Sequence, residues 1–301
     1  MSYKITVDFA PVYECITSLN AFLGKQNHNA MDAGALWVRG VQGRFAPVML
    51  QKMKEVMKFT DNFSLSLYIW TCPGERSAEG FLDWFEALSS GELYEIAGRF
   101  GQTVPSNLAG LRDSAAEVIR VWNAEYYRHI DPAILEGLQQ EAKARAASLN
   151  EDNGLEVFEA ATEGMRLYPP ETLKQIILTP QYHARPLVTS TLYDEYMFTA
   201  YSCDALPPEQ GRPPASLLRL TRALSDETRL FILRLLTGRQ LNFTEIVKEV
   251  GLSKSTIHYH LIALRAAGLV IVHTSGKSTS YSLRPEALHS LHGRIGSYLE
   301  G

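Results

Sequence analysis

The stretch that decides the fold is residues 242–270, NFTEIVKEVGLSKSTIHYHLIALRAAGLV. Asn242 and Glu245 have the spacing of a capping box, in which two side chains satisfy each other's backbone N–H groups at the start of a helix. Gly251 predicts that this short helix ends in a left-handed turn, and Ser253 predicts the cap of a second, longer helix. Two helices joined by so short a turn form a helix-turn-helix.

The second helix of this stretch has an apolar side and a polar side. Ile257, Leu261 and Leu264 recur at helical spacing and are expected to face the core. Leu252, in the turn, is expected to fill the angle between the two helices. The polar side of the N-terminal half is the part of a recognition helix that enters the major groove of DNA. The candidate DNA contacts on that side are Lys254, Ser255, Thr256, His258 and Tyr259.

His258 and His260 form a His-x-His pattern that invites a metal interpretation. On a helix, however, residues i and i+2 point about 200° apart, so these two side chains cannot share one metal ion. We therefore interpret His258 as a DNA contact and His260 as a packing residue.

The segment before the helix-turn-helix predicts two more helices. Leu217, Leu220 and Leu224 form a short apolar stripe, and Ser225 can cap a following helix that ends at Gly238. The acidic residues at the start of that helix lie where a helix N-terminus favours negative charge, so they do not indicate an acidic site.

The segment after it predicts a hairpin and a last helix. Residues 269–274 and 279–283 are strand-like and flank a tight turn, which places Lys277 at the tip of a wing as a further candidate DNA contact. Gly276 would let the backbone approach DNA closely, and Pro285 starts the final helix. Helix, helix, helix-turn-helix, hairpin and helix is the order of a winged-helix domain.

The first and last helices of this domain are more apolar than so small a core requires. We expect the surplus to form a two-fold dimer interface, because exposed apolar residues that are clustered mark contact surfaces. The candidate interface residues are Leu217, Leu220, Leu288, Leu291, Ile295 and Leu299.

The C-terminal part resembles the ArsR/SmtB-type winged-helix repressors. The matching stretches are LSDETRLFILRLL (residues 224–236), SKSTIHYHLIALRAAGLV (residues 253–270) and the wing GKSTSYSL (residues 276–283). The resemblance implies a homodimer that represses its operator. The N-terminal half, with ILTPQYHARP leading through YMFTAY into the winged helix, is similar to a subgroup with a long helical domain of unassigned role.

The sequence departs from the metal-sensing members of this family. Those sensors place cysteines in the first helix of the helix-turn-helix, whereas residues 242–250 contain none. Glu286, His289 and His292 share roughly one face of the last helix, where a partner subunit could complete a site. We interpret them as solvated helix residues, so the sequence predicts no metal site and no cofactor.

The charge is divided unevenly along the chain. The 301 residues carry a formal net charge of −4, but residues 216–301 hold 11 Lys and Arg against 6 Asp and Glu (net +5), which leaves 18 against 27 (net −9) before them. Only the C-terminal part has the balance that phosphate binding needs. Four prolines in CDALPPEQGRPPAS (residues 203–216) indicate a linker. We expect domains at 1–204 and 216–301, joined by residues 205–215.

The first domain is predicted to be mostly helical, with a late pair of strands. Residues 175–182 and 195–203 are rich in β-branched and aromatic residues and could form a hairpin, so the whole chain is predicted to be mainly α with small β elements, an α+β fold. All four tryptophans lie in this half. They are either core residues or part of an aromatic effector pocket, for which the candidates are Trp122, Tyr126, His183 and Arg185, with Glu125 as a further polar anchor.

Other classes of protein fit the sequence less well. Cys15, Cys72 and Cys203 are far apart and read as reduced thiols of a cytoplasmic protein, and no membrane anchor is visible. Hydrolase, zinc-protease and phosphate-loop motifs are missing, so catalysis is not expected. The sequence predicts a regulator that binds double-stranded DNA as a homodimer and responds to a small-molecule effector. The alternative is an interaction module whose N-terminal domain docks a protein that recruits or masks the winged helix.

Overall fold

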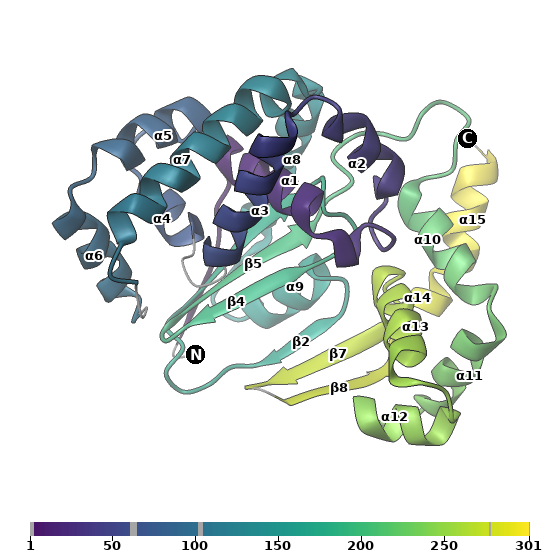
Figure 1. Cartoon of the computed structure of the whole chain (residues 1–301). Helices are drawn as coiled ribbons and strands as arrows, with labels where there is room; N and C mark the ends of the chain where they lie inside the picture. Colours follow the sequence, from purple (N-terminus) through teal and green to yellow (C-terminus); the bar gives the residue numbers. More distant parts are fainter. Residues whose placement is uncertain (1–2, 61–64, 102–104, 277, 301) are drawn as a thin grey trace. The chain divides into compact units, whose positions relative to one another are not determined.

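The computed structural model describes residues 3–60, 65–101, 105–276 and 278–300. The chain forms two compact units that do not follow a single cut in the sequence (Figure 1). The N-terminal unit comprises residues 1–148 and 172–205, and the C-terminal unit comprises residues 149–171 and 206–301. The expected boundary is therefore corrected for residues 149–171, which the sequence placed in the first domain. Helices with two small sheets make an α+β fold, as the sequence predicts.

The N-terminal unit contains a four-stranded sheet in the order β1-β3-β5-β4. Its strands are β1 (Lys4–Val7), β3 (Gln175–Gln181), β4 (Thr189–Tyr193) and β5 (Tyr196–Ser202). β3 and β5 run parallel, so the expected hairpin of these two segments is wrong. The hairpin partner of β5 is β4, which lies between the two segments that the sequence predicted to be strands. In the sheet, β5 lies between β3 and β4.

Helices cover the central strand of this sheet on both faces. Ile177 of β3 belongs to the main helical core, while Ile176 and Leu178 point to the opposite face and are also fully buried. α1 and α8 pack against β3. The helices of the unit are α1 (Pro11–Leu23), α2 (Gly34–Gln42), α3 (Pro47–Thr60), α4 (Leu65–Thr71), α5 (Ala78–Ala87), α6 (Ser90–Arg99), α7 (Leu108–Glu125) and α8 (Pro132–Ser148), with short 3-10 turns at Lys25–Asn27 and Tyr127–His129.

The C-terminal unit has the predicted winged-helix order. Its helices after residue 206 are α10 (Ala215–Leu224), α11 (Glu227–Leu235), α12 (Phe243–Val250), α13 (Lys254–Ala266), α14 (Pro285–His289) and α15 (Leu291–Glu300). The sequence predicted one final helix, but the structure separates α14 from α15 at Ser290. The wing strands β7 (Val270–Ser275) and β8 (Ser278–Leu283) form an antiparallel hairpin, and β6 (Leu241–Asn242) pairs with β8.

A fourth strand of the wing sheet comes from an earlier part of the sequence. After α9 (Gly154–Ala161), β2 (Met165–Tyr168) pairs in parallel with β7 and completes the order β2-β7-β8-β6. Gly164, at φ 109°, precedes β2, and a Cβ there would lie 2.9 Å from the Val270 carbonyl oxygen. Only glycine therefore allows this close approach of the two backbones. In the described part of the chain, no helix is both long and apolar enough to cross a membrane.

Candidate nucleic-acid interface and cavity

The first helix of the helix-turn-helix is held at both ends by local hydrogen bonds. The Asn242 side chain accepts from the Glu245 backbone N–H at 3.0 Å, and the Glu245 carboxylate accepts from the Asn242 N–H at 2.7 Å. Gly251 ends α12 with φ 75° and donates its N–H to the Val247 carbonyl at 3.0 Å. The predicted capping box and left-handed turn are thus both present, and they set the angle at which the chain enters the next helix.

The N-terminus of α13 carries a small cluster of hydroxyl groups. The Ser253 Oγ accepts from the Thr256 backbone N–H at 3.2 Å, which makes it the helix cap. The same oxygen lies 2.9 Å from the Ser255 Oγ and 2.8 Å from the Thr256 Oγ1. A cap of this kind stabilises a helix by about 1 kcal/mol. It also fixes the direction in which the first turn of α13 presents its hydroxyls and its backbone N–H groups.

The two sides of α13 divide as the sequence predicts. Ile257, Leu261 and Leu264 are buried in the core of the C-terminal unit. Lys254, Ser255, His258 and Tyr259 are exposed, and Thr256 is half-buried. Tyr259 is 59% exposed, so its ring and hydroxyl are accessible to a partner. The exposed row follows the N-terminal half of the helix.

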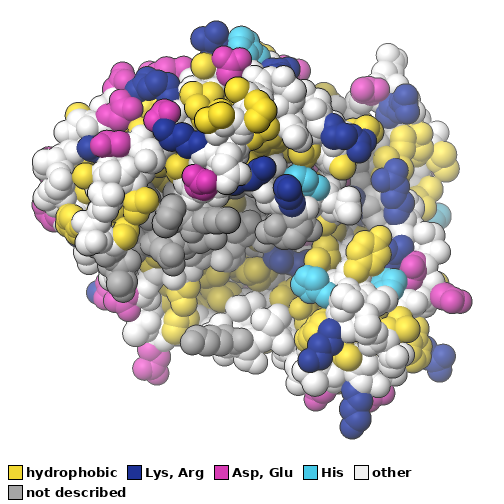
Figure 2. Space-filling view, viewed as in Figure 1, with side chains coloured by type: hydrophobic (Ala, Val, Ile, Leu, Met, Phe, Trp, Pro, Cys, Tyr) yellow, Lys and Arg dark blue, Asp and Glu magenta, His cyan; other side chains and the backbone are white. Residues whose placement is uncertain are grey.

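His258 is oriented by the neighbouring helix. Its ring lies edge-on to Phe243 of α12, with the ring centroids 6.4 Å apart. Figure 2 shows Lys, Arg and His side chains on the exposed surface over α12 and α13. Lys248 of α12 is exposed, as are Glu245 and Glu249 of the same helix, and Lys254 is exposed at the start of α13. This surface can hold phosphates and also present a histidine to a base edge.

Three sequence expectations need correction or lie outside the structure. Leu252 is 40% exposed, so it does not fill the angle between the helices. Asp226, rather than Ser225, caps α11 by accepting from the Arg229 N–H at 2.9 Å. Lys277 lies outside the described residues, so its role as a wing contact stays a prediction.

His260 packs inside the C-terminal unit, as interpreted from the sequence. Its side chain is buried, and its Nδ1 lies 3.7 Å from Asp226 Oδ1. The backbone N–H of Arg229 lowers the pKa of Asp226, and the charges of Arg229 and His260 act in the same direction. Asp226 therefore joins the start of α11 to the inner side of the recognition helix.

The expected dimer residues fall into two groups. Leu217 and Leu220 are buried within the chain, and Leu220 belongs to its core, so their assignment to an interface is corrected. Leu288 and Leu291 pack partly against the same core. Ile295 is half-buried and Leu299 is 74% exposed, so the end of α15 is the apolar surface left available.

The N-terminal unit contains a cavity of about 490 Å³. Tyr126, His183 and Arg185 line it, whereas Trp122 is fully buried in the core and donates from its Nε1 to the Ser18 Oγ at 3.0 Å. Trp122 is therefore corrected from pocket residue to core residue. Glu125, the further anchor, does not line the cavity with its side chain, but its carbonyl accepts from Arg44 at 3.0 Å.

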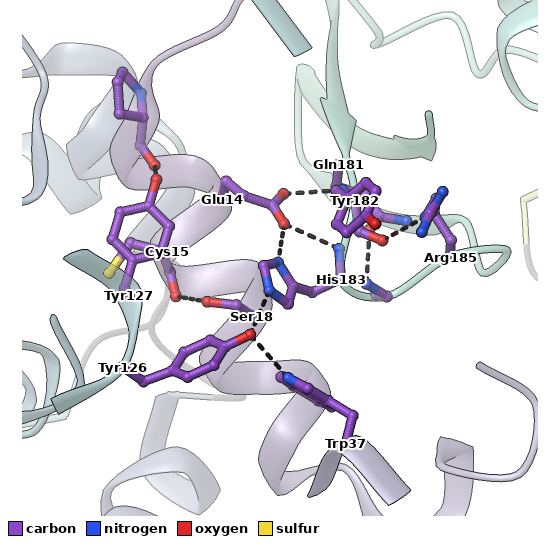
Figure 3. Close-up of polar contacts among 12 residues, drawn as sticks. Glu14, Cys15, Ser18, Trp37, Tyr126, Tyr127, Gln181, Tyr182, His183 and Arg185 are labelled. Carbon is purple, nitrogen blue, oxygen red and sulfur yellow. Dashed lines mark hydrogen bonds and ion pairs between the residues drawn. The ribbon is translucent and has the colours of Figure 1, made fainter. Parts of the chain in front are cut away.

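Three residues that line this cavity, Trp37, Tyr126 and His183, belong to a hydrogen-bonded chain that ends at Glu14 (Figure 3). The Trp37 Nε1 donates to the Tyr126 hydroxyl at 2.8 Å, and that hydroxyl lies 2.7 Å from His183 Nε2. His183 Nδ1 meets Glu14 at 2.5 Å, and Glu14 also accepts the backbone N–H groups of Tyr182 and His183 at 3.0 and 2.9 Å. Burial raises the pKa of Tyr126 to about 12, which keeps its hydroxyl protonated.

Sequence reasoning missed Glu14 and Arg44, and among the four tryptophans it singled out Trp122 rather than Trp37. Glu14 is fully buried in α1, where it sits between Val12 and Ile16 on a mainly apolar helix. A carboxylate on such a helix is the signal that could have identified it, because a buried charge needs partners. Among the residues that the structure describes, no group of three or more His, Cys, Asp or Glu side chains could hold a metal ion.

Comparison with known proteins places the C-terminal unit in a family. The family described as "Bacterial regulatory protein, arsR family" matches residues 226–272. The transcriptional regulator CmtR of Mycobacterium tuberculosis is 33% identical over 81 residues, which are 27% of this chain and 69% of CmtR. The transcriptional repressor SdpR of Bacillus subtilis is 36% identical over 67 residues, which are 22% of this chain and 74% of SdpR.

A solved ArsR-like regulator from Rhodococcus sp. RHA1 is 31% identical, with a TM-score of 0.26 over 29% of this chain and 84% of its own. The family match lies within the winged-helix part of the sequence, where the capped helix-turn-helix is found. Through this part, the chain belongs to the arsR family of bacterial regulatory proteins and is a DNA-binding transcriptional regulator.

Proposed function

We propose that this protein is a repressor that binds a palindromic operator as a homodimer, and that its N-terminal unit responds to a small-molecule effector. The observation that carries the proposal is the exposed row Lys254, His258 and Tyr259 on a helix whose opposite side is buried in the core. A recognition helix needs this division, because one side must be rigidly anchored while the other reads bases.

The side chains on this row suit two kinds of DNA contact. A lysine such as Lys254 pairs with phosphate or guanine, and the imidazole of His258 can bond to a base edge. The net charge of +5 over residues 216–301 supports phosphate binding in a chain that is negative overall. Repression is supported by the relative SdpR, which is described as a transcriptional repressor.

The homodimer is supported by α15. None of its residues is buried within the single chain, although Ile295 and Leu299 are apolar. Two copies of such a helix cover each other in a two-fold interface, and a two-fold protein binds two half-sites about one DNA turn apart.

A second candidate function, docking of a protein partner, is favoured by two residues of the N-terminal unit. Leu36 is 76% exposed and Val48 is 82% exposed, although both are aliphatic. We favour the effector response over docking of a protein, because the cavity has the volume of a small-molecule site, whereas docking is supported only by two exposed side chains.

Selection of DNA from a random duplex library tests the proposal. Duplexes that bind to the purified full chain are recovered and sequenced, and the enriched motif is identified from them. We expect a two-fold symmetric motif with half-sites about 10 base pairs apart. Absence of enrichment over the input library would contradict operator binding, and a single asymmetric half-site would contradict the dimer.

A further inference from the structure

The cavity of the N-terminal unit is walled by aromatic rings. Five rings line it, those of Trp37, Tyr126, His129, Tyr182 and His183. The Trp37 ring lies 5.8 Å from Tyr126 and 5.5 Å from His183, centroid to centroid. At about 490 Å³ the cavity is within the range that holds small organic molecules. A flat apolar ligand can therefore pack against these rings.

The polar atoms of this wall already have partners. His183 is hydrogen-bonded through Nδ1 to the carboxylate of Glu14 and through Nε2 to the Tyr126 hydroxyl at 2.7 Å. The Tyr126 oxygen in turn accepts the Trp37 N–H. Because this chain is satisfied internally, a ligand meets ring surfaces that are held in place rather than free donors (Figure 3).

The charged groups at the cavity are engaged to different degrees. Arg185 is paired with Asp204 at 2.6 Å and lies 3.6 Å from the centre of the Tyr182 ring. Asp131 accepts from the Ala133 N–H at the start of α8, and Asp32 also has a partner within the chain. Of these groups, Arg185 is thus paired with a carboxylate, and Asp131 accepts a backbone N–H.

Arg44 differs from them. Among the residues that the structure describes, it forms no ion pair; its Nη1 donates to the Glu125 carbonyl at 3.0 Å, and its guanidinium lies 5.6 Å from the centre of the Tyr126 ring. A guanidinium has five N–H donors and fits the two oxygens of a carboxylate. The cavity thus offers ring surfaces and, within the described part of the chain, a cation without an anionic partner.

We propose that this cavity binds a small aromatic carboxylate, with its ring against Trp37 and Tyr126 and its carboxylate on Arg44. The ring would pack by offset or edge-to-face contacts, and Arg44 would orient the acid group. A ligand of this class is the candidate effector for the response proposed above. Binding of the ligand does not depend on that proposed function, whereas an effect of the ligand on DNA binding rests on it.

The test uses three probes of one shape in calorimetric titrations of the full chain without DNA. They are 2-naphthoate, the neutral 2-naphthamide and the cationic 2-naphthylmethylamine. We expect naphthoate to bind about tenfold or more tighter than the amide, because the amide cannot form a charge-assisted pair with Arg44. Equal affinities for acid and amide, tighter binding of the amine, or no binding of any probe would overturn the proposal.

Variants locate the carboxylate. Arg44→Gln should reduce naphthoate affinity to that of the amide, while Arg44→Lys should retain part of the preference. The matched control is Arg39→Gln, since Arg39 is an exposed arginine of α2 that does not line the cavity. An acid-to-amide ratio unchanged in Arg44→Gln, or abolished in Arg39→Gln, would overturn the assignment of Arg44.

Operator titrations with and without naphthoate separate this proposal from the proposed function. Naphthoate binding with unchanged operator affinity would support the ligand site and contradict the effector response. If the chain selected no operator at all, the proposed function would fail, whereas the calorimetric result would still decide the ligand site.

Discussion

Met165 of β2 pairs with Val272 of β7 in parallel register, so a segment from the middle of the sequence forms one edge of the wing sheet. The Val272 N–H donates to the Gly164 carbonyl at 2.7 Å, which adds a backbone bond at the start of this pairing. In the sequence, residues 149–171, which contain this strand, are both preceded and followed by segments of the N-terminal unit. The wing sheet of this protein therefore includes a strand that lies about 50 residues before the first helix of the winged-helix domain in the sequence.

The first prediction concerns this extra strand. Leu167→Ala removes a buried side chain of β2 and should destabilise the C-terminal unit by about 2–5 kcal/mol. Hydrogen exchange of the β7 amides, followed by mass spectrometry, should become faster. The matched control is Arg166→Ala, which removes an exposed ion pair with Glu159 and should cost about 1 kcal/mol or less. Unchanged exchange in Leu167→Ala would show that β2 does not support the wing.

The second prediction concerns base reading by α13. His258→Ala should cost about 1–3 kcal/mol on the selected operator and little on a scrambled duplex, because a base contact carries the sequence preference. Thr256→Ala should act in the same direction, although its hydroxyl also lies 2.8 Å from Ser253. His289→Ala is the control, an exposed histidine on α14. Equal losses of affinity on both duplexes would mean that this helix is not the sequence reader.

The third prediction concerns the dimer. Replacing Ile295 and Leu299 with Asp should give monomers in sedimentation experiments and weaken operator binding, because the charges would be buried in an apolar interface. Leu36→Asp, which changes an exposed leucine of the N-terminal unit, should leave the dimer intact. A double variant that sediments as a dimer with full operator affinity would refute the interface.

The fourth prediction is a pH dependence of stability. The pKa of Asp226 is lower in the folded chain than its ordinary value, so the charged form is favoured by folding. Its contribution is fully present above the unfolded pKa and disappears as the pH falls through the folded one. Asp226→Ala should cost about 1 kcal/mol of unfolding free energy at pH 7 and much less near pH 2. An equal cost at both pH values would contradict the role of the carboxylate.

The winged helix could be predicted because its signals are local. Asn242, Glu245, Gly251 and Ser253 each act within four residues, and the structure shows the bonds that their spacing implies. β2 could not be predicted in the same way, since its four residues find their partner about 100 positions later. Pairing at such a distance depends on tertiary packing and leaves no local pattern.

The N-terminal unit shows the same limit. Composition identified the segments of β3 and β5 as strands. It did not show that β3 and β5 run parallel to each other, nor that β4 pairs with β5 in antiparallel orientation. The cavity gathers side chains from segments that are far apart in the sequence. Tyr126, His183 and Arg185 were singled out from the sequence, whereas Arg44 was not and Trp37 was not distinguished from the other tryptophans. Leu220 was assigned to an interface because apolar spacing alone does not separate a core residue from a contact residue.

The central claim, that the C-terminal unit binds operator DNA through a basic recognition surface, is tested most directly by titrating the full chain with operator duplex at several salt concentrations. With roughly six to ten phosphate contacts per dimer, log affinity should fall with log salt at a slope of about −5 to −9. Lys254→Ala, and equally Lys277→Ala, should weaken operator and scrambled duplexes alike and reduce the slope by about one unit for each phosphate that is no longer neutralised. A slope near zero for the unmodified chain would contradict the account.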